Sequence, residues 1–139
     1  MSWNSYIDNL IAHSKDASGK CHVESACIIS IDGGTQWTTA GANVTPITPN
    51  EAAEIAKPFK SCDFTSFMVG GCTISSTRYQ FLREMDKKIC LFKLKDHGSI
   101  SMQSSKTAIV IAKCPEGGQQ GNANKAVAVI AEYLESLNM

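Results

Sequence analysis

The stretch FTSFMVGGCTISSTRYQFLREMDKKICLFKLKDHGSISMQSSKTAIVIAK (residues 64–113) decides the fold of this chain. It contains short runs rich in β-branched and aromatic residues, namely FTSFMV, CTISSTRYQF, ICLFKL, SISMQ and TAIVIAK. Gly70-Gly71 and Asp96-His97-Gly98 lie between such runs, which is typical of turns between strands. Short connections favour antiparallel neighbours. The stretch therefore predicts five successive strands in an antiparallel meander.

A hairpin and a helix are predicted ahead of this meander. The apolar run SACIISI is followed by DGG and then by QWTTA, which predicts two paired strands with Trp37 on the second. Thr48-Pro49-Asn50-Glu51 forms a capping box with proline at the first helical position. It predicts a helix from about Pro49 to Ala56, and Pro58 is expected to stop it.

Both ends of the chain have the periodicity of amphipathic helices. The first apolar stripe consists of Trp3, Ile7, Leu10 and Ile11. The second consists of Val127, Ile130, Leu134 and Leu137. Ser2 is a candidate N-cap for the first helix, and Asn122 or Asn124 for the second, which follows the glycine-rich loop CPEGGQQGN. The expected class is therefore α+β, with about seven strands in one sheet that the helices cover.

Length and composition predict one domain over residues 1–139. A chain of 139 residues with 43% apolar content can build a single core without metals or disulfides. It has no apolar run long enough for a transmembrane segment, and the start MSWNSYIDNLIAHSKD lacks the basic beginning and long apolar stretch of a signal peptide. We therefore expect a cytoplasmic protein.

The cysteines and histidines do not suggest catalysis or metal binding. Six cysteines are scattered through apparent strands and loops, and we expect mostly buried free thiols. There is no CxxC pair, and His13, His22 and His97 have no metal-ligand spacing, so no metal or other cofactor is predicted. Only Cys62 or Cys114 with His97 could form a nucleophile and base, and phosphate-binding loops are absent. An enzyme is not expected.

The charges are unevenly distributed although the formal net charge is zero. Residues 1–56 carry two Lys against six Asp or Glu, whereas residues 57–125 carry eleven Lys or Arg against five acids. The second segment therefore has an excess of six positive charges, which suits an acidic protein or lipid partner better than duplex nucleic acid. Any single lysine can equally well be a solvated surface residue.

The start SWNSYIDNL (residues 2–10) resembles the N-terminal W-x-x-Y-I/V-D signature of profilins. The resemblance continues, in order, through ITPNE, FMVGGCTI, KTAIVIAK, GNANKAV and EYL. It implies a central antiparallel sheet with the terminal helices on one face and shorter helices on the other. It also implies a cytoskeletal protein of the cytoplasm and cell cortex that binds one actin monomer, regulates actin polymerisation and nucleotide exchange, and is itself a monomer.

The resemblance also implies a groove for proline-rich partner proteins. A polyproline II helix is already extended, so flat aromatic rings and a few hydrogen-bond donors suffice to bind it. The positions that correspond to the groove are Trp3, Tyr6, Trp37 and Tyr133, with Asn9 and Met139 at its edges. The chain has only two Trp and three Tyr, and four of these five fall in this set. Without the resemblance, a helix aromatic is more often a core residue.

The implied actin contacts lie mostly in the basic segment. They are Lys57, Phe59, Lys60, Arg78, Lys93, Lys95, Gly121, Asn124 and Lys125. Vertebrate profilins have a histidine before the glycine of the last loop, whereas this chain has Gln119 and Gln120, so pH dependence from that histidine should be absent. Phosphoinositide head groups are a further implied ligand, for which Arg83, Lys87 and Lys88 are the candidates.

Two other interpretations remain open at this point. One is an adaptor with a profilin fold that binds polyproline or phosphoinositide and binds actin only weakly. The other is a regulatory scaffold of similar build that does not contact actin. Retention on immobilised poly-L-proline that is lost on Trp3→Ala would distinguish a profilin from such a scaffold.

Overall fold

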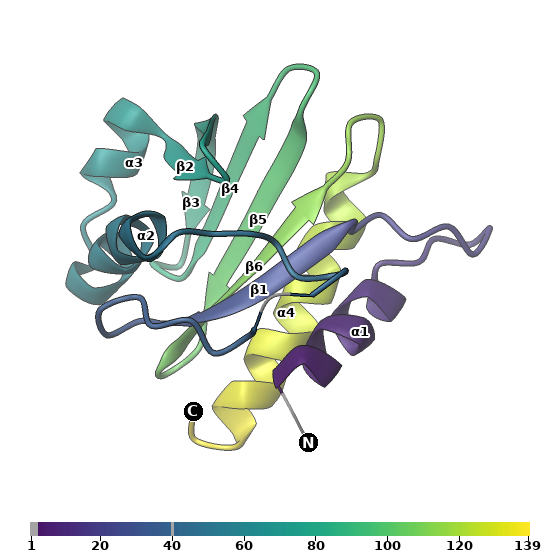
Figure 1. Ribbon diagram of the computed structural model, residues 1–139, viewed down its shortest axis with the longest axis horizontal. Coiled ribbons are helices and arrows are strands. Elements are labelled where there is room, and N and C mark those ends of the chain that lie inside the picture. The colour runs from purple at the N-terminus through teal and green to yellow at the C-terminus, as the bar shows by residue number, and fades with distance from the viewer. Residues whose placement is uncertain (1–2, 40) are drawn as a thin grey trace.

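The computed structural model describes residues 3–39 and 41–139, and in them a curled antiparallel sheet lies between two pairs of helices (Figure 1). The helices are α1 (Trp3–His13), α2 (Pro49–Ser61), α3 (Thr65–Gly70) and α4 (Gln120–Ser136). The strands are β1 (Ser25–Ser30), β2 (Cys72–Ile74), β3 (Thr77–Met85), β4 (Ile89–Leu94), β5 (Gly98–Ser104) and β6 (Ala108–Cys114). Their order in the sheet is β1-β6-β5-β4-β3-β2. The predicted N-cap Ser2 lies outside the described residues.

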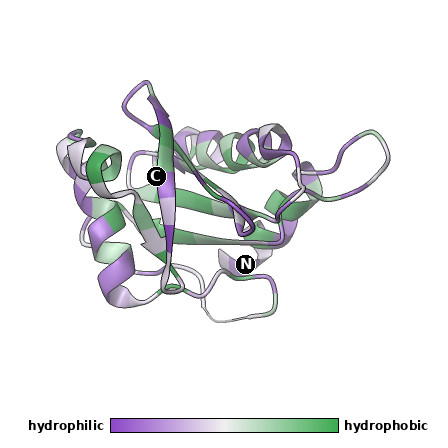
Figure 2. Cartoon of the chain, turned by 90° about the horizontal axis from the view of Figure 1, so that it is seen from above, coloured by the Kyte–Doolittle hydropathy of each residue, from purple (hydrophilic) through white to green (hydrophobic). Residues whose placement is uncertain are grey.

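The middle of the sheet is buried on both faces. On β6, Ile109 and Ile111 face the cluster formed with α2 and α3, whereas Val110 and its even-numbered neighbours face α1 and α4. Because side chains alternate along a strand, such a run of apolar residues covers two cores at once. Figure 2 shows this distribution, with hydrophobic residues along the strands and hydrophilic ones in the outer loops. The prediction of terminal helices on one face and the other helices on the opposite face is confirmed, although α2, with 13 residues, is longer than α1, with 11.

The described residues form six strands, not the predicted seven, and FTSFMV is the first reason. This segment forms α3 instead of a strand. Phe64 and Phe67 are spaced as on a helix, and both rings pack against Phe59 from α2. The carboxylate of Asp63 accepts hydrogen bonds from the backbone and the hydroxyl of Thr65, which starts the helix. Tertiary burial of the phenylalanines therefore overrides the local strand propensity.

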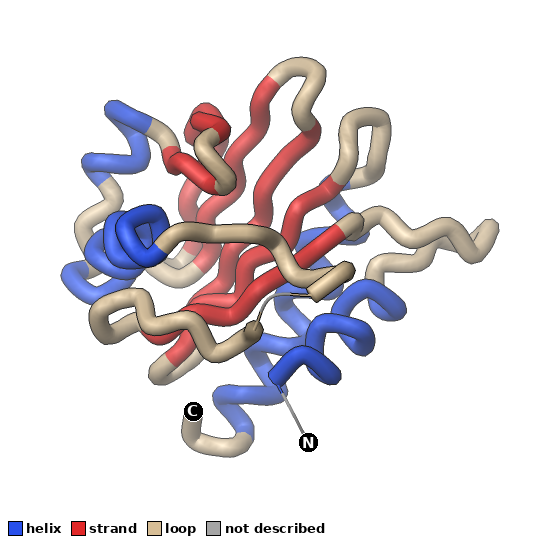
Figure 3. Tube along the Cα trace, viewed as in Figure 1, coloured by secondary structure: helices blue, strands red, loops and turns tan. Residues whose placement is uncertain are grey.

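The second strand predicted for QWTTA does not form in the described residues: residues 36–39 belong to a long loop (Figure 3), and Ala40 lies outside the described residues. The segment follows β1, but only an isolated bridge joins Gln36 to Ile29. Further along, the hydroxyl of Thr38 accepts the hydrogen bond of the Ile28 N–H, where a backbone carbonyl would continue a ladder. The Thr38 side chain thus takes the place of a backbone partner for the Ile28 N–H, and the pairing of β1 with this segment ends there.

CTISSTRYQF was predicted as one strand but is divided into β2 and the start of β3. Ser75 and Ser76 have positive φ angles of 53° and 64°, which fold the chain back in a tight turn. The carboxylate of Glu51 accepts hydrogen bonds from both of their N–H groups, at 3.0 and 2.8 Å. This long-range contact holds a turn that two serines would not specify by themselves.

Two helix boundaries differ from the prediction. Pro58 lies inside α2 and does not stop it, because the helix continues to Ser61 and buries Phe59. The hydroxyl of Ser61 donates to the Lys57 carbonyl and closes this last turn. The other boundary is the start of α4, which begins at Gln120 after Gln119 and receives no side-chain cap from an asparagine.

The capping box predicted at Thr48 and Glu51 is present, with both of its hydrogen bonds formed. Of the six cysteines, Cys27, Cys72, Cys90 and Cys114 are buried, as expected, while Cys62 is exposed at the end of α2. Burial raises the pKa of the Cys27 thiol to about 12, so it behaves as a small apolar side chain. Among the described residues, no helix is long and apolar enough to cross a membrane.

Candidate functional site

Four aromatic side chains from three separate segments form a continuous row, which we call the aromatic row. It consists of Trp37, Trp3, Tyr6 and Tyr133. The ring centroids of Trp37 and Trp3 are 4.7 Å apart, those of Trp3 and Tyr6 5.1 Å, and those of Tyr6 and Tyr133 6.0 Å. The first three rings are half-buried, and Tyr133 is 51% exposed. The structure thus brings together all four aromatic residues predicted for the groove.

The α1 helix carries two members of this row, Trp3 and Tyr6. It also holds Trp37 in place through hydrogen bonds to the loop after β1. Trp3 and Tyr6 lie one turn apart on α1, beside the buried residues Ile7 and Leu10 that pack against α4. Tyr133 projects from the last turns of α4. The indole N–H and the phenol hydroxyl groups are hydrogen-bond donors next to apolar rings, which is the chemistry needed to bind an extended chain of carbonyl groups.

Asn4 was missed at the sequence level, although it holds Trp37 in the row. Its side-chain amide donates to the Thr39 carbonyl at 3.0 Å, and its carbonyl accepts the Thr39 N–H at 2.9 Å. The Trp37 N–H donates to the Ile28 carbonyl of β1 at 2.9 Å. Trp37 is therefore fixed from both sides. No local signal could have identified Asn4, because its partner is 35 residues away in the chain.

The two predicted edge residues differ in their surroundings. Asn9 is exposed on α1, whereas Met139 is half-buried against the cluster of α1 and α4. The Met139 carbonyl accepts the Thr107 N–H at 2.7 Å and the Ser105 hydroxyl at 2.8 Å. The last residue is thereby tied to the β5–β6 turn, close to the packed helices. Met139 therefore occupies a fixed position near this end of the molecule.

A second surface lies on the same face of the sheet as α4 and follows from the strand register. Ser101 donates a hydrogen bond to Asn124 of α4, so it faces this helix. Ser99 shares that face, because side chains alternate, and it pairs with Lys93. Lys93 in turn pairs with Gln80, which lies two residues after Arg78 on β3.

By the same register, Ser101 pairs with Leu91, and Leu91 pairs with Arg83. We call the resulting surface the basic face: Arg78, Arg83, Lys93 and Lys125, with Gly121 and Asn124. None of its four basic side chains takes part in an ion pair within the described part of the chain. Their charges are therefore available to an acidic partner.

An apolar groove of about 240 Å³ lies within this face, between α4 and the ends of three strands. Its lining includes Met85, Ile89 and Leu91 from the strands, and Val127 and Ala128 from α4. Next to it, Leu82 is 51% exposed at a bulge in β3 between Phe81 and Arg83. The basic face thus combines positive charge with exposed apolar surface, the composition of a protein interface.

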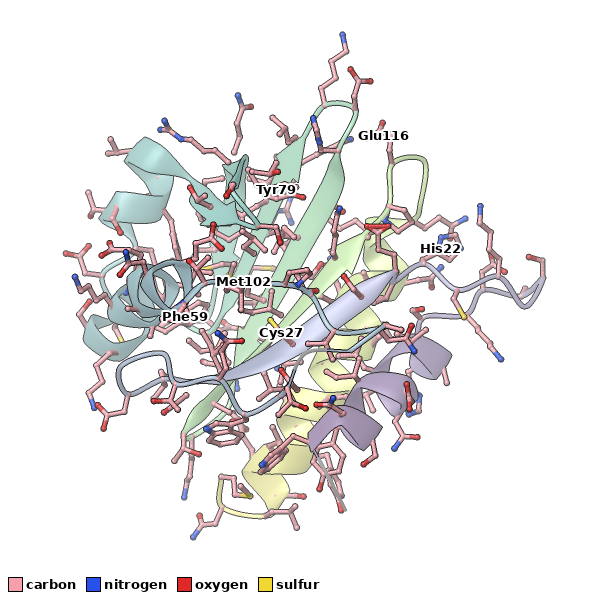
Figure 4. All side chains as sticks on the ribbon, in the orientation of Figure 1. His22, Cys27, Phe59, Tyr79, Met102 and Glu116 are labelled. Carbon is pink, nitrogen blue, oxygen red and sulfur yellow. The ribbon has the colours of Figure 1, made fainter. Side chains whose placement is uncertain are left out.

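Three further residues predicted for actin belong to α2 and lie on the other face of the sheet. Lys57 and Lys60 are exposed on α2, on the opposite face of the sheet, and pair with Glu54 at 3.2 Å and Asp32 at 3.0 Å. Phe59, labelled at α2 in Figure 4, is only 3% exposed and belongs to the core cluster on this side of the sheet. The Phe59 ring is therefore not accessible on the surface of this structure. Lys95 is exposed in the turn after β4.

Of the three residues predicted for a phosphoinositide, Arg83 and Lys88 lie on the α4 side of the sheet, whereas Lys87 lies elsewhere. Arg83 belongs to the basic face, whereas Lys88 pairs with Glu135 of α4 at 3.6 Å. Lys87 lies toward Asp63: hydrogen bonds from Thr65 lower the pKa of Asp63, and the charge of Lys87 adds to this effect. The described structure therefore does not gather these three cations around one point.

One of the cysteines considered for catalysis, Cys114, is not activated. Burial raises the pKa of the Cys114 thiol, which keeps it protonated and a poor nucleophile. Cys62 lies at the end of α2 and His97 in the turn between β4 and β5. Among the described residues, no group of three or more His, Cys, Asp or Glu side chains could hold a metal ion.

The chain matches the family model described as Profilin over residues 1–139. It is 63% identical over 140 residues to a profilin of Clypeaster japonicus, covering 100% of both chains. Its fold is similar to Acanthamoeba castellanii profilin II, with a TM-score of 0.81, 27% identity, and 99% and 100% of the two chains covered. It also resembles mouse profilin IIa in complex with a double repeat from the FH1 domain of mDia1, with a TM-score of 0.73, 23% identity and 100% of both chains covered.

Proposed function

The chain belongs to the profilin family, and on that basis we propose that it binds monomeric actin and proline-rich segments of partner proteins through two separate surfaces. It acts by binding, without catalytic chemistry of its own, in the cytoplasm and at the cell cortex. The observation that carries this proposal is the aromatic row, which α1, the loop after β1 and α4 build together.

The aromatic row is the proposed site for proline-rich segments. A polyproline II helix has little conformational entropy left to lose, so a few rings and donors bind it without a deep pocket. The row offers two indole rings in contact and two phenol rings beside them. Proline rings can pack between them while the indole N–H and phenol hydroxyl groups donate to exposed carbonyls.

Retention on immobilised poly-L-proline tests this site. Tyr133→Ala should weaken retention strongly, because it removes an exposed ring from the end of the row. Leu137→Ala is the matched control, since Leu137 is 47% exposed one turn further along the same chain segment. Equal retention of the wild type and both variants would contradict the assignment of this row.

The basic face is the proposed site for one actin monomer, which is an acidic partner. It carries four cations that form no ion pair in the described part of the chain, and Lys125 is one of the residues that line its apolar groove. Charge can therefore guide the encounter, and apolar contact can hold the complex. Lys125 and Tyr133 are eight residues apart on α4, which separates them by about 12 Å along the helix axis. The two partners can therefore be bound together.

Titration of fluorescently labelled monomeric actin separates the two surfaces. Arg78→Glu with Lys125→Glu should abolish binding, whereas Lys57→Glu with Lys60→Glu, on the other side of the sheet, should leave it nearly unchanged. A proline-rich peptide at saturating concentration should not displace actin from the wild type. Loss of binding in the α2 variant alone would move the actin site to that helix.

Regulation of polymerisation and nucleotide exchange is proposed to follow from this binding. The protein would favour an actin conformation that releases its nucleotide faster, so the chemistry remains that of the partner. Release of a fluorescent nucleotide from actin, with and without the protein, measures the effect. If the wild type retains poly-L-proline binding but does not bind actin, the chain is an adaptor with a profilin fold.

Phosphoinositide binding is the weaker part of the proposal, and Arg83 is its best-placed residue. Because Arg83 lies on the basic face, a lipid head group there would compete with actin. Vesicles that contain phosphatidylinositol bisphosphate should then reduce actin binding by the wild type and have less effect on Arg83→Gln. Binding to vesicles without any competition would place the lipid elsewhere.

A further inference from the structure

A buried histidine connects the loop before β1 to the start of α4. His22 is 3% exposed and lies at the entry to β1, below the loop that carries Glu116 (Figure 4). Its Nε2 atom is 2.7 Å from Oδ2 of Asp16, and its Nδ1 atom accepts the Gln119 N–H at 2.9 Å. These contacts belong to neither of the two proposed binding surfaces.

The loop that carries His22 is held rigidly by its own hydrogen bonds. Oδ1 of Asp16 accepts the backbone N–H and the hydroxyl of Ser18, at 2.8 and 2.6 Å, and the Lys20 N–H at 3.1 Å. The hydroxyl of Ser14, at the end of α1, accepts the N–H groups of His22 and Val23. The imidazole ring is therefore held in place by the chain on either side of it.

His22 supplies an anchor that α4 does not provide for itself. Gln119 is the N-cap residue of α4, and no side-chain hydrogen bond caps the helix there. On the sheet side, the Gln120 side chain donates to the carbonyls of Phe92 and Ile100 at 3.3 Å each. The hydrogen bond from the Gln119 N–H to His22 fixes the start of α4 to the loop that follows α1. The first turns of α4 then carry Gly121, Asn124 and Lys125 of the basic face.

The bond to Gln119 exists in only one protonation state of His22. Nδ1 must be unprotonated to accept an N–H, so the ring hydrogen lies on Nε2 and is donated to Asp16. Hydrogen bonds from Ser18 and then from His22 lower the pKa of Asp16, which stays a carboxylate. A second proton on the ring would attach to Nδ1 and place two donors face to face.

The groups around the ring oppose one another. The Asp16 carboxylate attracts an imidazolium ion, whereas the Gln119 N–H repels it. On the neighbouring segments, burial raises the pKa of the Cys114 thiol, which stays neutral. Glu116 accepts the Gly98 N–H, and the exposed Lys20 lies on the same loop as the histidine. Protonation would therefore retain the Asp16 contact and break the one that holds α4.

We propose that His22 is a positioning residue for the basic face, and that its protonation releases the start of α4 and weakens binding of the acidic partner. The first half concerns this chain alone. The second half rests on the proposed binding of actin. Two substitutions separate the roles of the ring: His22→Asn keeps an acceptor oxygen in place of Nδ1 and does not titrate, while His22→Leu removes the acceptor.

The primary measurement is the hydrogen-exchange protection factor of the Gln119 amide in the free protein, at about pH 8 and at about pH 5.5. Loss of one hydrogen bond should lower protection by about threefold to tenfold. We expect this loss in the wild type at the lower pH only, in His22→Leu at both values, and in His22→Asn at neither. Circular dichroism melting curves check that each variant is folded.

The second measurement is the affinity for monomeric actin at the same two pH values, relative to His97→Asn as an exposed histidine control. The affinity for actin should fall wherever the protection of the Gln119 amide falls. Retention on poly-L-proline should stay the same. Full protection of Gln119 in His22→Leu, or unchanged actin affinity despite lost protection, would overturn the proposal. If protection changes as expected but actin is not bound at any pH, the anchor is supported and the proposed actin function fails.

Discussion

Asn4, a polar residue of α1, connects two segments of the aromatic row. It adjoins Trp3 in sequence, yet its amide group holds the backbone of Thr39 and so brings Trp37 against Trp3. One short polar side chain thereby joins two segments of the aromatic row. Two of its hydrogen bonds go to the backbone of residue 39, and a third goes to the Thr39 hydroxyl at 3.1 Å.

Asn4→Ala should weaken binding of a proline-rich peptide by about threefold to tenfold, the effect of one or two exposed hydrogen bonds. The reason is that Trp37 would lose its fixed position. Isothermal titration with the peptide measures the change, and tryptophan emission should shift because both indoles sit in the row. Asn43→Ala, which removes a bond to Asp8 from the same loop, is the control and should bind normally. Equal affinity of all three proteins would refute the role of Asn4.

Two carboxyl groups predict the direction of the pH dependence of stability. Hydrogen bonds from Ser18 and His22 lower the pKa of Asp16, and hydrogen bonds from Thr65 lower that of Asp63. A lowered native pKa means that the unfolded chain binds protons first. The stabilisation is complete above the unfolded value of about 3.9 and is lost as the pH falls through the native value.

Urea midpoints measured from about pH 5 down to about pH 2.5 should therefore fall for the wild type. Asp63→Asn should show a smaller fall, because its amide oxygen still accepts from Thr65 but no longer titrates. A variant curve parallel to that of the wild type would show that Asp63 has no part in the acid sensitivity.

At the scale of elements, Glu51 joins α2 to the turn between β2 and β3. Its carboxylate completes the capping box at Thr48 and also accepts the N–H groups of Ser75 and Ser76. Both serines have positive φ, a conformation that costs a non-glycine residue about 1 kcal/mol or more. The turn therefore depends on an element that precedes it by more than twenty residues.

Glu51→Ala should lower the free energy of unfolding by about 2 to 4 kcal/mol, because it removes three hydrogen bonds to a charged acceptor. Urea denaturation followed by circular dichroism measures the loss. Glu54→Ala, one turn along α2, removes only an exposed ion pair with Lys57 and should change stability by less than about 1 kcal/mol. Similar losses in the two variants would contradict the bridging role of Glu51.

At the scale of the whole molecule, one sheet serves two cores. Phe92 of β4 is fully buried on the α2 and α3 side, with its ring 5.0 Å from that of Phe67 and 5.7 Å from that of Phe81. Trp3 and Trp37 pack on the other side. Because the same strands contribute side chains to both cores, a substitution that destabilises one core should also destabilise the other.

Phe92→Ala should cost about 3 to 5 kcal/mol and shift the unfolding transition seen by tryptophan fluorescence as far as the one seen by circular dichroism. The fluorescence reports the aromatic row, across the sheet from the substitution. Leu82→Ala, half-exposed at the β3 bulge, is the control and should have a much smaller effect. Separate transitions would show that the two cores unfold independently.

Local patterns in the sequence predicted most of the elements, and the resemblance to profilins named the four residues of the aromatic row. The capping box at Thr48, the apolar stripes of α1 and α4, and the strands β1, β4, β5 and β6 follow from short-range periodicity. The aromatic groove could be named because this chain has few Trp and Tyr, and its resemblance to profilins assigned them to one site.

Tertiary structure alone decided where local preferences conflict or where partners are far apart in the chain. Burial of Phe64 and Phe67 against Phe59 made α3 a helix. The strand register selected Arg78, Lys93 and Lys125 as one surface and left Lys57 and Lys60 on the other side of the sheet.

The contacts that no local pattern could indicate are single long-range hydrogen bonds: Asn4 to Thr39, Glu51 to Ser75 and His22 to Gln119. Periodicity reports which face of a segment is apolar, because burial repeats along the chain. A single polar contact does not repeat, and it exists only when the packed elements bring two distant residues within hydrogen-bonding distance. The sequence by itself therefore determined the family, the layers and the aromatic residues of the site, while the folded structure decided how those residues are held.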